Sequence, residues 1–143
     1  MTPASVTVPA SAEFVRVAAQ FVLQTARHLA VPAASAPLFE VAVVEALANA
    51  VKHGSRGRPG AVVTCEVERT PRGLSIRIYD EGEGFTPPAR VEPRDPEAIG
   101  LPNIPESGYG VPIMKSVFQE IEGRREGGRF CLELKIASEL PLA

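Results

Sequence analysis

The alternation of apolar and polar positions predicts an edge strand followed by an amphipathic helix at the start of the chain. Ser5–Pro9 (SVTVP) has the pattern of a short edge strand, and Pro9 closes it because proline cannot donate to a sheet ladder. Ser11 is a candidate N-cap for the helix that follows. The apolar positions of that helix recur at intervals of three and four residues: Phe14, Val17, Ala18, Phe21, Val22 and Leu29. We therefore expect this first helix to be a scaffold element.

The most apolar helix is predicted over Phe39–Gly54 (FEVAVVEALANAVKHG), with Gly54 as a natural C-terminal stop. Such a helix should be mostly buried, yet Glu45, Asn49 and Lys52 recur at i, i+4 and i+7 and share one face. Buried carboxylates and amides need partners. On this helix alone, structural hydrogen bonds would be the simpler explanation for these side chains.

Further strands and a last helix are predicted downstream. Ala61–Glu68 and Leu74–Asp80 alternate apolar and polar residues, and the short connection between them predicts an antiparallel pair. A helix is predicted over Val111–Ile121, with Pro112 in its first turn, and a last strand over Arg129–Ile136. In the strand ending at Asp80, the inward residues are Leu74, Ile76 and Ile78, and the outward residues are Ser75, Arg77 and Tyr79.

Length and composition indicate one globular domain over residues 1–143. Hydrophobic content of 45% with 22% charged residues is typical of a soluble protein, and a net charge of -2 does not favour nonspecific binding along nucleic acid. No apolar run is long enough to span a bilayer, and the N-terminus lacks the features of a signal peptide. We therefore expect a cytoplasmic protein with no membrane or direct nucleic-acid partner.

Both cysteines are predicted to be structural. Cys65 alternates with Val63 and Val67 and should face the core, whereas Cys131 should point away from the face of its apolar neighbours. Cysteines on different faces do not favour a disulfide, and their spacing matches no metal site.

Two glycine-containing motifs flank a proline-rich stretch that has no clear periodicity. Asp80–Phe85 (DEGEGF) lies at the end of a strand, and Ser107–Gly110 (SGYG) opens a helix. The stretch between them, Thr86–Glu106, is long for a structureless loop in a compact domain, and such loops are usually functional or disordered. We expect a lid over a ligand at about residues 86–107.

The motifs E-x-x-x-N, D-x-G-x-G-F and G-x-G, in this order, resemble the nucleotide site of the GHKL ATPases. That superfamily includes the ATP domains of histidine kinases, gyrase and MutL. The short chain, its VTVPA opening and its proline-rich segment are most similar to the anti-sigma-factor serine kinases of the superfamily. The resemblance covers nearly the whole chain. It implies the Bergerat-type fold, an α/β two-layer sandwich with a mixed, largely antiparallel sheet and helices on one face.

The resemblance also implies roles for the motif residues in binding ATP and Mg²⁺. Glu45 would be the general base that deprotonates the attacking hydroxyl, and Asn49 would be the magnesium ligand. Lys52 could pair with a phosphate, although a solvated helix end explains it about as well. Asp80 would accept a hydrogen bond from the exocyclic amine of adenine, or would cap a turn. The remaining ATP-binding positions are those where the backbone would approach the nucleotide: Gly82, Gly84, Gly108, Tyr109 and Gly110.

The leading hypothesis is therefore an ATP-dependent protein-serine kinase that is also an anti-sigma factor. By resemblance it would phosphorylate a STAS-type anti-anti-sigma factor, sequester a sigma factor and form a homodimer. Glu106 stands where such kinases often carry an arginine, which motivates the alternative of a non-catalytic ATP- or partner-binding module. A detached histidine-kinase ATP domain is a weaker hypothesis, because the helix that carries His28 has no hairpin partner in the predicted pattern.

Overall fold

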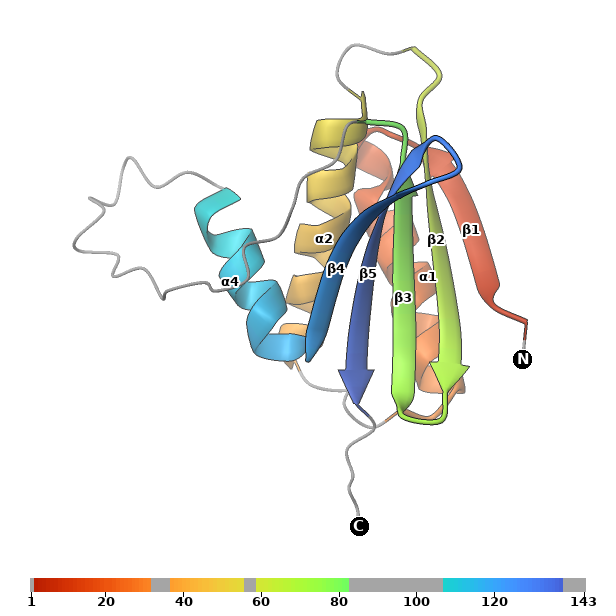
Figure 1. Cartoon of the computed structure of the whole chain (residues 1–143), viewed down its shortest axis with the longest axis vertical. Coiled ribbons are helices and arrows are strands. Elements are labelled where there is room, and N and C mark those ends of the chain that lie inside the picture. Colours follow the sequence, from red (N-terminus) through yellow and green to blue (C-terminus); the bar gives the residue numbers. More distant parts are fainter. Residues whose placement is uncertain (1, 32–36, 56–58, 83–106, 138–143) are drawn as a thin grey trace, which may run out of the picture.

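The structure, a computed structural model, describes residues 2–31, 37–55, 59–82 and 107–137 (Figure 1). The elements follow in the order β1 (Ala4–Pro9), η1 (Ala12–Phe14), α1 (Val15–His28), α2 (Pro37–Ser55), β2 (Val62–Thr70), β3 (Gly73–Asp80), α4 (Ser107–Val117), β4 (Glu120–Glu126) and β5 (Arg129–Ala137). The stretch Thr86–Glu106, over which the lid is predicted, lies outside the described residues, and so does Gly84.

The strands form one five-stranded sheet in the order β1-β2-β3-β5-β4. β1 lies at one edge, as its pattern predicted, and β4 lies at the other. β3 is central: its Ile78 lies opposite Cys65 of β2 on one side and Leu132 of β5 on the other. The predicted two-layer α/β fold is confirmed. Every pairing of the described strands is antiparallel, so the expected mixed sheet shows no parallel pair among them.

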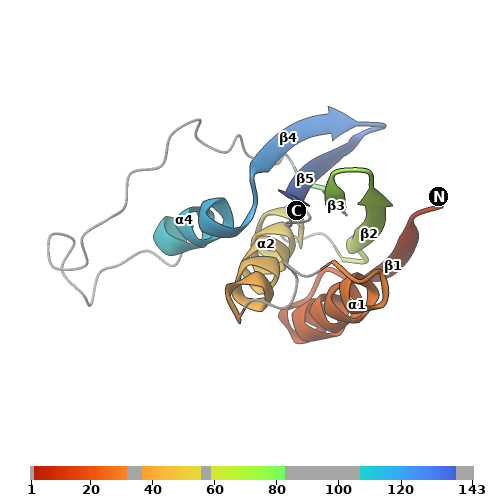
Figure 2. The same ribbon diagram turned by 90° about the horizontal axis from the view of Figure 1, so that it is seen from below.

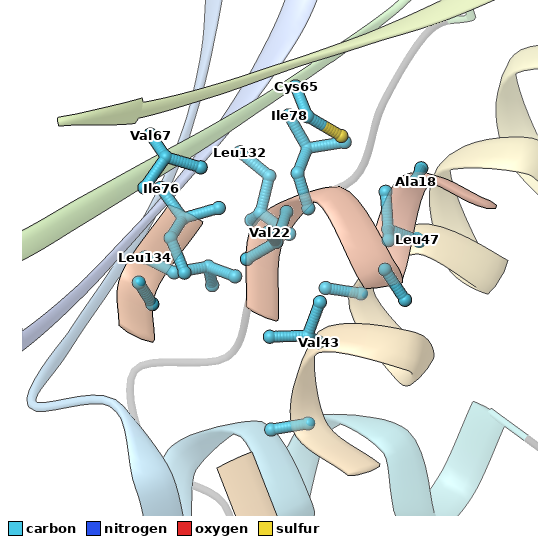
Figure 3. Close-up of a cluster of buried hydrophobic side chains, with 14 of the residues drawn as sticks. Ala18, Val22, Val43, Leu47, Cys65, Val67, Ile76, Ile78, Leu132 and Leu134 are labelled. Atoms are coloured by element: carbon cyan, nitrogen blue, oxygen red, sulfur yellow. The ribbon is translucent and has the colours of Figure 1, made fainter. Parts of the chain in front are cut away.

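The described helices all cover one face of the sheet (Figures 1 and 2). α1 and α2 lie side by side, and α4 packs on the other flank of α2. Fully or nearly fully buried aliphatic side chains from both layers form the core between them (Figure 3), among them Val22, Val43, Leu47, Ile76 and Ile78. Phe39 of α2 meets Phe118 edge to face, with ring centroids 6.0 Å apart, and so ties the end of α4 to α2.

The opposite face of the sheet carries a network of charged side chains. Arg77, in the middle of β3, lies among three carboxylates: Glu66 at 3.0 Å, Glu68 at 3.0 Å and Glu133 at 3.5 Å. Ser75 and Tyr79 point to this face as predicted, yet both are buried. Ser75 donates a hydrogen bond to Glu133, and the Arg129 guanidinium lies 4.2 Å from the centroid of the Tyr79 ring. The long charged side chains therefore shield Ser75 and Tyr79 from water.

Both cysteines are buried and free, and they lie on opposite faces as predicted. Cys65 belongs to the core beneath the helices, whereas Cys131 lies opposite Tyr79 in the strand register. Burial raises the pKa of the Cys65 thiol to about 12, so the thiol stays protonated near neutral pH.

The helix predicted over Val111–Ile121 is wrong at both ends. α4 begins at Ser107 and ends at Val117, so Pro112 lies inside the helix rather than in its first turn. Ile121 belongs to β4, a strand that the apolar pattern did not predict. β4 has the sequence EIEGRRE. Ile121 faces the helices, but the next inward position is Gly123, and the outward positions carry charged residues. The strand therefore shows no alternation of apolar and polar residues. Charges on an edge strand also discourage pairing with another sheet.

Two smaller differences concern turns. Ser11 precedes the short 3-10 helix η1, and its side chain makes no capping hydrogen bond. The Ser11 carbonyl instead accepts a hydrogen bond from the Phe14 N–H at 2.9 Å. β2 continues to Thr70, so the turn into β3 is tighter than expected.

Candidate functional site

The polar face of α2 lines a cavity of about 240 Å³ beside the start of α1. Glu45, Asn49 and Lys52 all contribute to its wall. The rest of the lining is apolar: Ala12, Val15, Ala48 and Val51. The helical spacing that the sequence predicted therefore brings these polar side chains to one cavity.

α2 presents this face because its apolar stripe faces elsewhere. Phe39, Val43 and Leu47 recur every four residues and are almost completely buried in the core. Glu45 and Asn49 follow a different line along the helix, at the rim of the buried surface. Glu45 is half-buried, and the Asn49 residue is 8% exposed.

The side-chain amide of Asn49 makes no hydrogen bond to any other residue in the described part of the chain. Glu45 and Lys52 likewise form no ion pair within residues 2–31, 37–55, 59–82 and 107–137. A buried polar group without a partner costs about 1–3 kcal/mol, so a partner is expected from the cavity itself. The described residues thus do not supply the structural hydrogen bonds that would have explained this helix most simply.

Asp80 ends β3 and is nearly inaccessible to solvent, at 3% exposure. Its Oδ1 accepts a hydrogen bond from the Gly82 N–H at 2.8 Å. Burial raises the pKa of the Asp80 carboxyl, and this effect is opposed by that hydrogen bond and by the charges of His53 and Arg125. The carboxylate is therefore a fixed acceptor with one oxygen already engaged.

The turn after Asp80 packs backbone to backbone against the end of α2. A Cβ added at Gly82 would lie 2.3 Å from the His53 carbonyl oxygen, and one added at Gly54 would lie 2.7 Å from the Asp80 Cβ. The sequence predicted Gly54 only as a helix stop, and Gly82 as a place where the backbone would approach a nucleotide. α2 in fact continues to Ser55, one residue past Gly54. The structure shows that both glycines are needed for contact within the protein, because no side chain fits at either position.

Sequence reasoning missed Arg125, whose Nη1 donates a hydrogen bond to the Gly82 carbonyl oxygen at 2.7 Å. The residue lies on β4, the strand that the apolar pattern did not reveal. The adjacent arginines Arg124 and Arg125 were a usable signal, because neighbouring strand residues face opposite sides of a sheet.

Gly108, Tyr109 and Gly110 lie in the first turn of α4, which begins at Ser107 and packs against α2. The first N–H groups of a helix have no partner within it and favour anions. The backbone of this motif is therefore suited to phosphate oxygens. Gly84 lies outside the described residues.

A metal ion at this site would need ligands from a bound molecule. Among the residues that the structure describes, no group of three or more His, Cys, Asp or Glu side chains could hold a metal ion. The cavity instead offers the amide oxygen of Asn49 and the carboxylate of Glu45. Such hard oxygen donors fit Mg²⁺, which keeps several waters and commonly shares its coordination with substrate phosphates.

The chain was compared with known proteins. It is 32% identical over 90 residues to the anti-sigma F factor of Clostridium acetobutylicum, an alignment covering 63% of this chain and 61% of that protein. It is 34% identical over 97 residues to the anti-sigma F factor of Shouchella clausii, covering 68% and 56%. It is 34% identical over 80 residues to that of Bacillus cytotoxicus, covering 56% and 53%. The chain thus spans between 53% and 61% of the length of these relatives.

No helix in the described ranges is long and apolar enough to cross a membrane. Residues 8–136 match the histidine kinase-like ATPase domain family. The matched region contains α2 with its cavity, the Asp80 turn and the first turn of α4. The chain belongs to the histidine kinase-like ATPase domain family.

Proposed function

We propose that the protein binds ATP between α2, the Asp80 turn and α4, and that it is a protein-serine kinase and anti-sigma factor. Family membership supports the ATP site, and the relatives named anti-sigma F factor support the role in transcription control. The protein substrate would be a STAS-type anti-anti-sigma factor, and the second partner would be a sigma factor. A homodimer and a cytoplasmic location belong to the same proposal.

Asn49 and Lys52 would hold the triphosphate end of the nucleotide. The Asn49 amide would ligate Mg²⁺, and its fit is supported by its place on the cavity and its lack of a partner among the described residues. When bound, the ion would neutralise part of the phosphate charge. Lys52 is exposed one turn further along the same face, where its ammonium group could pair with a phosphate oxygen.

Glu45 would act as the general base. It lies one turn before Asn49 on the same face, so a hydroxyl group brought to the phosphates would meet its carboxylate. The serine oxygen would bond to the γ-phosphorus as the bond from that phosphorus to the β–γ bridging oxygen breaks. Glu45 would take the hydroxyl proton, and ADP would leave. Phosphoryl transfer depends mainly on positioning and charge, so one placed carboxylate suffices.

Asp80 would recognise the adenine ring. Because its Oδ1 already accepts a hydrogen bond from the Gly82 N–H, its Oδ2 would accept a hydrogen bond from the exocyclic amine of adenine. Guanine presents an oxygen at that position, which the carboxylate would repel. The burial of Asp80 strengthens this discrimination, because little water competes for the carboxylate.

The observation that carries the proposal is the nearly buried Asn49 amide on the cavity wall, without a hydrogen bond from the described residues. Calorimetric titration with ATP, with and without Mg²⁺, tests it. We expect the wild type to bind ATP in a magnesium-dependent way. Asn49→Ala should lower the ATP affinity measured with Mg²⁺ by about tenfold or more, as expected for the loss of a metal ligand. Gln24→Ala removes an exposed amide from α1 and should bind like the wild type. Unchanged binding by Asn49→Ala would contradict the assignment.

Transfer of the labelled γ-phosphate to a STAS-type partner tests catalysis. Glu45→Gln should keep ATP binding and slow the transfer by about 100-fold or more, in line with the contribution of a general base. Glu40→Gln changes an exposed glutamate on the same helix and is the matched control. Undiminished transfer by Glu45→Gln would remove this residue from the mechanism. Binding without transfer in the wild type would favour the non-catalytic module that Glu106 motivates.

A further inference from the structure

The turn that follows Asp80 is held from two sides. On one side it packs against the end of α2, where an added Cβ at Gly82 would lie 2.3 Å from the His53 carbonyl oxygen. On the other side Arg125 reaches across from β4. Its Nη1 donates to the Gly82 carbonyl oxygen at 2.7 Å, and its Nη2 donates to the Gly128 carbonyl oxygen at 3.2 Å. One guanidinium group therefore links the β4–β5 turn to the turn that carries the buried carboxylate.

Strand geometry explains why Arg125, and not its neighbour, makes this link. Successive residues of a strand face opposite sides of the sheet. Arg124 lies on the outer face, where it pairs with Glu126 and Glu133 at 2.9 Å each. Arg125 lies on the helix side and forms no ion pair within the described ranges. Its hydrogen bonds go to two backbone carbonyls instead.

We propose that Arg125 is a positioning residue of the adenine site, which holds the Gly82 carbonyl and so fixes the turn that aims Asp80 at the base. This inference rests on the proposed ATP site and deepens it. Arg125 acts through Gly82 and Asp80 rather than by touching the nucleotide. A flexible turn would let the Asp80 carboxylate rotate away, whereas the two-sided clamp keeps it in the orientation that selects adenine.

The charges around Asp80 give this role a distinct signature. His53 from α2 and Arg125 from β4 both lower the pKa of the Asp80 carboxyl, as does the Gly82 N–H, while burial and the neighbouring Glu81 raise it. Removal of Arg125 should therefore raise the Asp80 pKa. Packing of the Arg125 side-chain stem alone would leave that pKa unchanged, and the loss of ATP affinity that accompanies the rise reports the hydrogen bond to Gly82.

The test compares Arg125→Ala with Arg124→Ala, which removes the same charge from the adjacent position on the other face. The Asp80 carboxyl is titrated by NMR in the nucleotide-free protein, and ATP affinity is measured by calorimetry. Arg125→Ala should raise the Asp80 pKa and weaken ATP binding about three- to tenfold, as expected for one exposed charge-assisted hydrogen bond. Arg124→Ala should match the wild type in both measurements.

Arg125→Lys keeps the charge and one of the two donating nitrogens, so it should recover most of the ATP affinity and a near-normal Asp80 pKa. It also serves as the informative variant should the alanine variant fold poorly. Equal effects of the two alanine variants would overturn the inference, and so would an unchanged ATP affinity in Arg125→Ala, whether or not its Asp80 pKa rises. Failure of the wild type to bind ATP would overturn the proposed function, and the NMR titration would then still decide whether Arg125 controls Asp80.

Discussion

Replacing Gly82 by alanine should force the end of α2 and the Asp80 turn apart. The added Cβ would lie 2.3 Å from the His53 carbonyl oxygen and 3.0 Å from the Gly54 Cα. Both neighbours are backbone atoms, so neither can rotate away as a flexible side chain could. The strain must be relieved by movement of the helix end or of the turn that Arg125 holds.

The magnitude follows from two opposing effects. Overpacking costs about 1–3 kcal/mol, and contact with backbone on two sides argues for the upper part of that range. A glycine-to-alanine change also restricts the unfolded chain, which by itself stabilises by about 0.4–1 kcal/mol. The net loss in the free energy of unfolding should be about 2 kcal/mol, which corresponds to a fall of about 6–8 °C in Tm for a domain of this size.

Urea and thermal unfolding followed by circular dichroism, together with ATP calorimetry, measure the effect. Gly127→Ala is the control, since its added Cβ meets nothing within 4 Å and only its φ of +60° is unfavourable. That control should lose about 1 kcal/mol from backbone strain and keep its ATP affinity. If Gly82→Ala were as stable as the wild type and bound ATP equally well, the prediction would be refuted, because the backbone at Gly82 would then not be in firm contact with the backbone at the end of α2.

Three further predictions concern buried or partly buried groups. Asp80→Asn should raise the free energy of unfolding at pH 7, because burial raises the Asp80 pKa and ionisation therefore opposes folding. Urea unfolding across pH should show this gain vanish below the ordinary aspartate pKa of 3.8, where Asp80 is protonated in both the folded and the unfolded protein. Arg77→Met should lower the free energy of unfolding by about 2 kcal/mol in the same assay, since three partly buried carboxylates lose their shared cation; a loss under about 0.5 kcal/mol would contradict this. Cys65 should resist alkylation at pH 8 in the folded protein and react in urea, as mass spectrometry would detect, because the thiol is buried with a pKa of about 12.

Helical and strand periodicity were sufficient to predict α2, which lines the cavity, and β3, which ends at Asp80. α2 has a strongly apolar stripe, so the positions of Glu45, Asn49 and Lys52 on another face followed from their spacing, and the structure brings them to one cavity. β3 was equally clear, because its inward residues are aliphatic. Each of these elements has a buried face, and a buried face requires apolar residues at regular intervals, which can be recognised in the sequence.

The sequence was less informative where charges or tertiary contacts decide the structure. β4 lies at the edge of the sheet and buries few of its side chains, so its sequence shows no apolar alternation. Neither the strand nor the contact of its Arg125 with Gly82 could therefore be predicted from the apolar pattern. Local rules predicted Gly54 only as a helix stop, whereas α2 continues to Ser55. The contact of Gly54 with Asp80, 26 positions away along the chain, is one that no local pattern can reveal. The lid at about residues 86–107 stays a prediction.

The charged network on the outer face of the sheet has a consequence for how the strands find each other. Arg77 draws its carboxylates from both neighbours of β3, with Glu66 and Glu68 on β2 and Glu133 on β5. A slip of one residue would turn Arg77 toward the aliphatic core and both Ile76 and Ile78 toward water. Such a slip would also leave three carboxylates without their cation. The network therefore favours a single strand alignment, and it does so on the face of the sheet that no described helix covers.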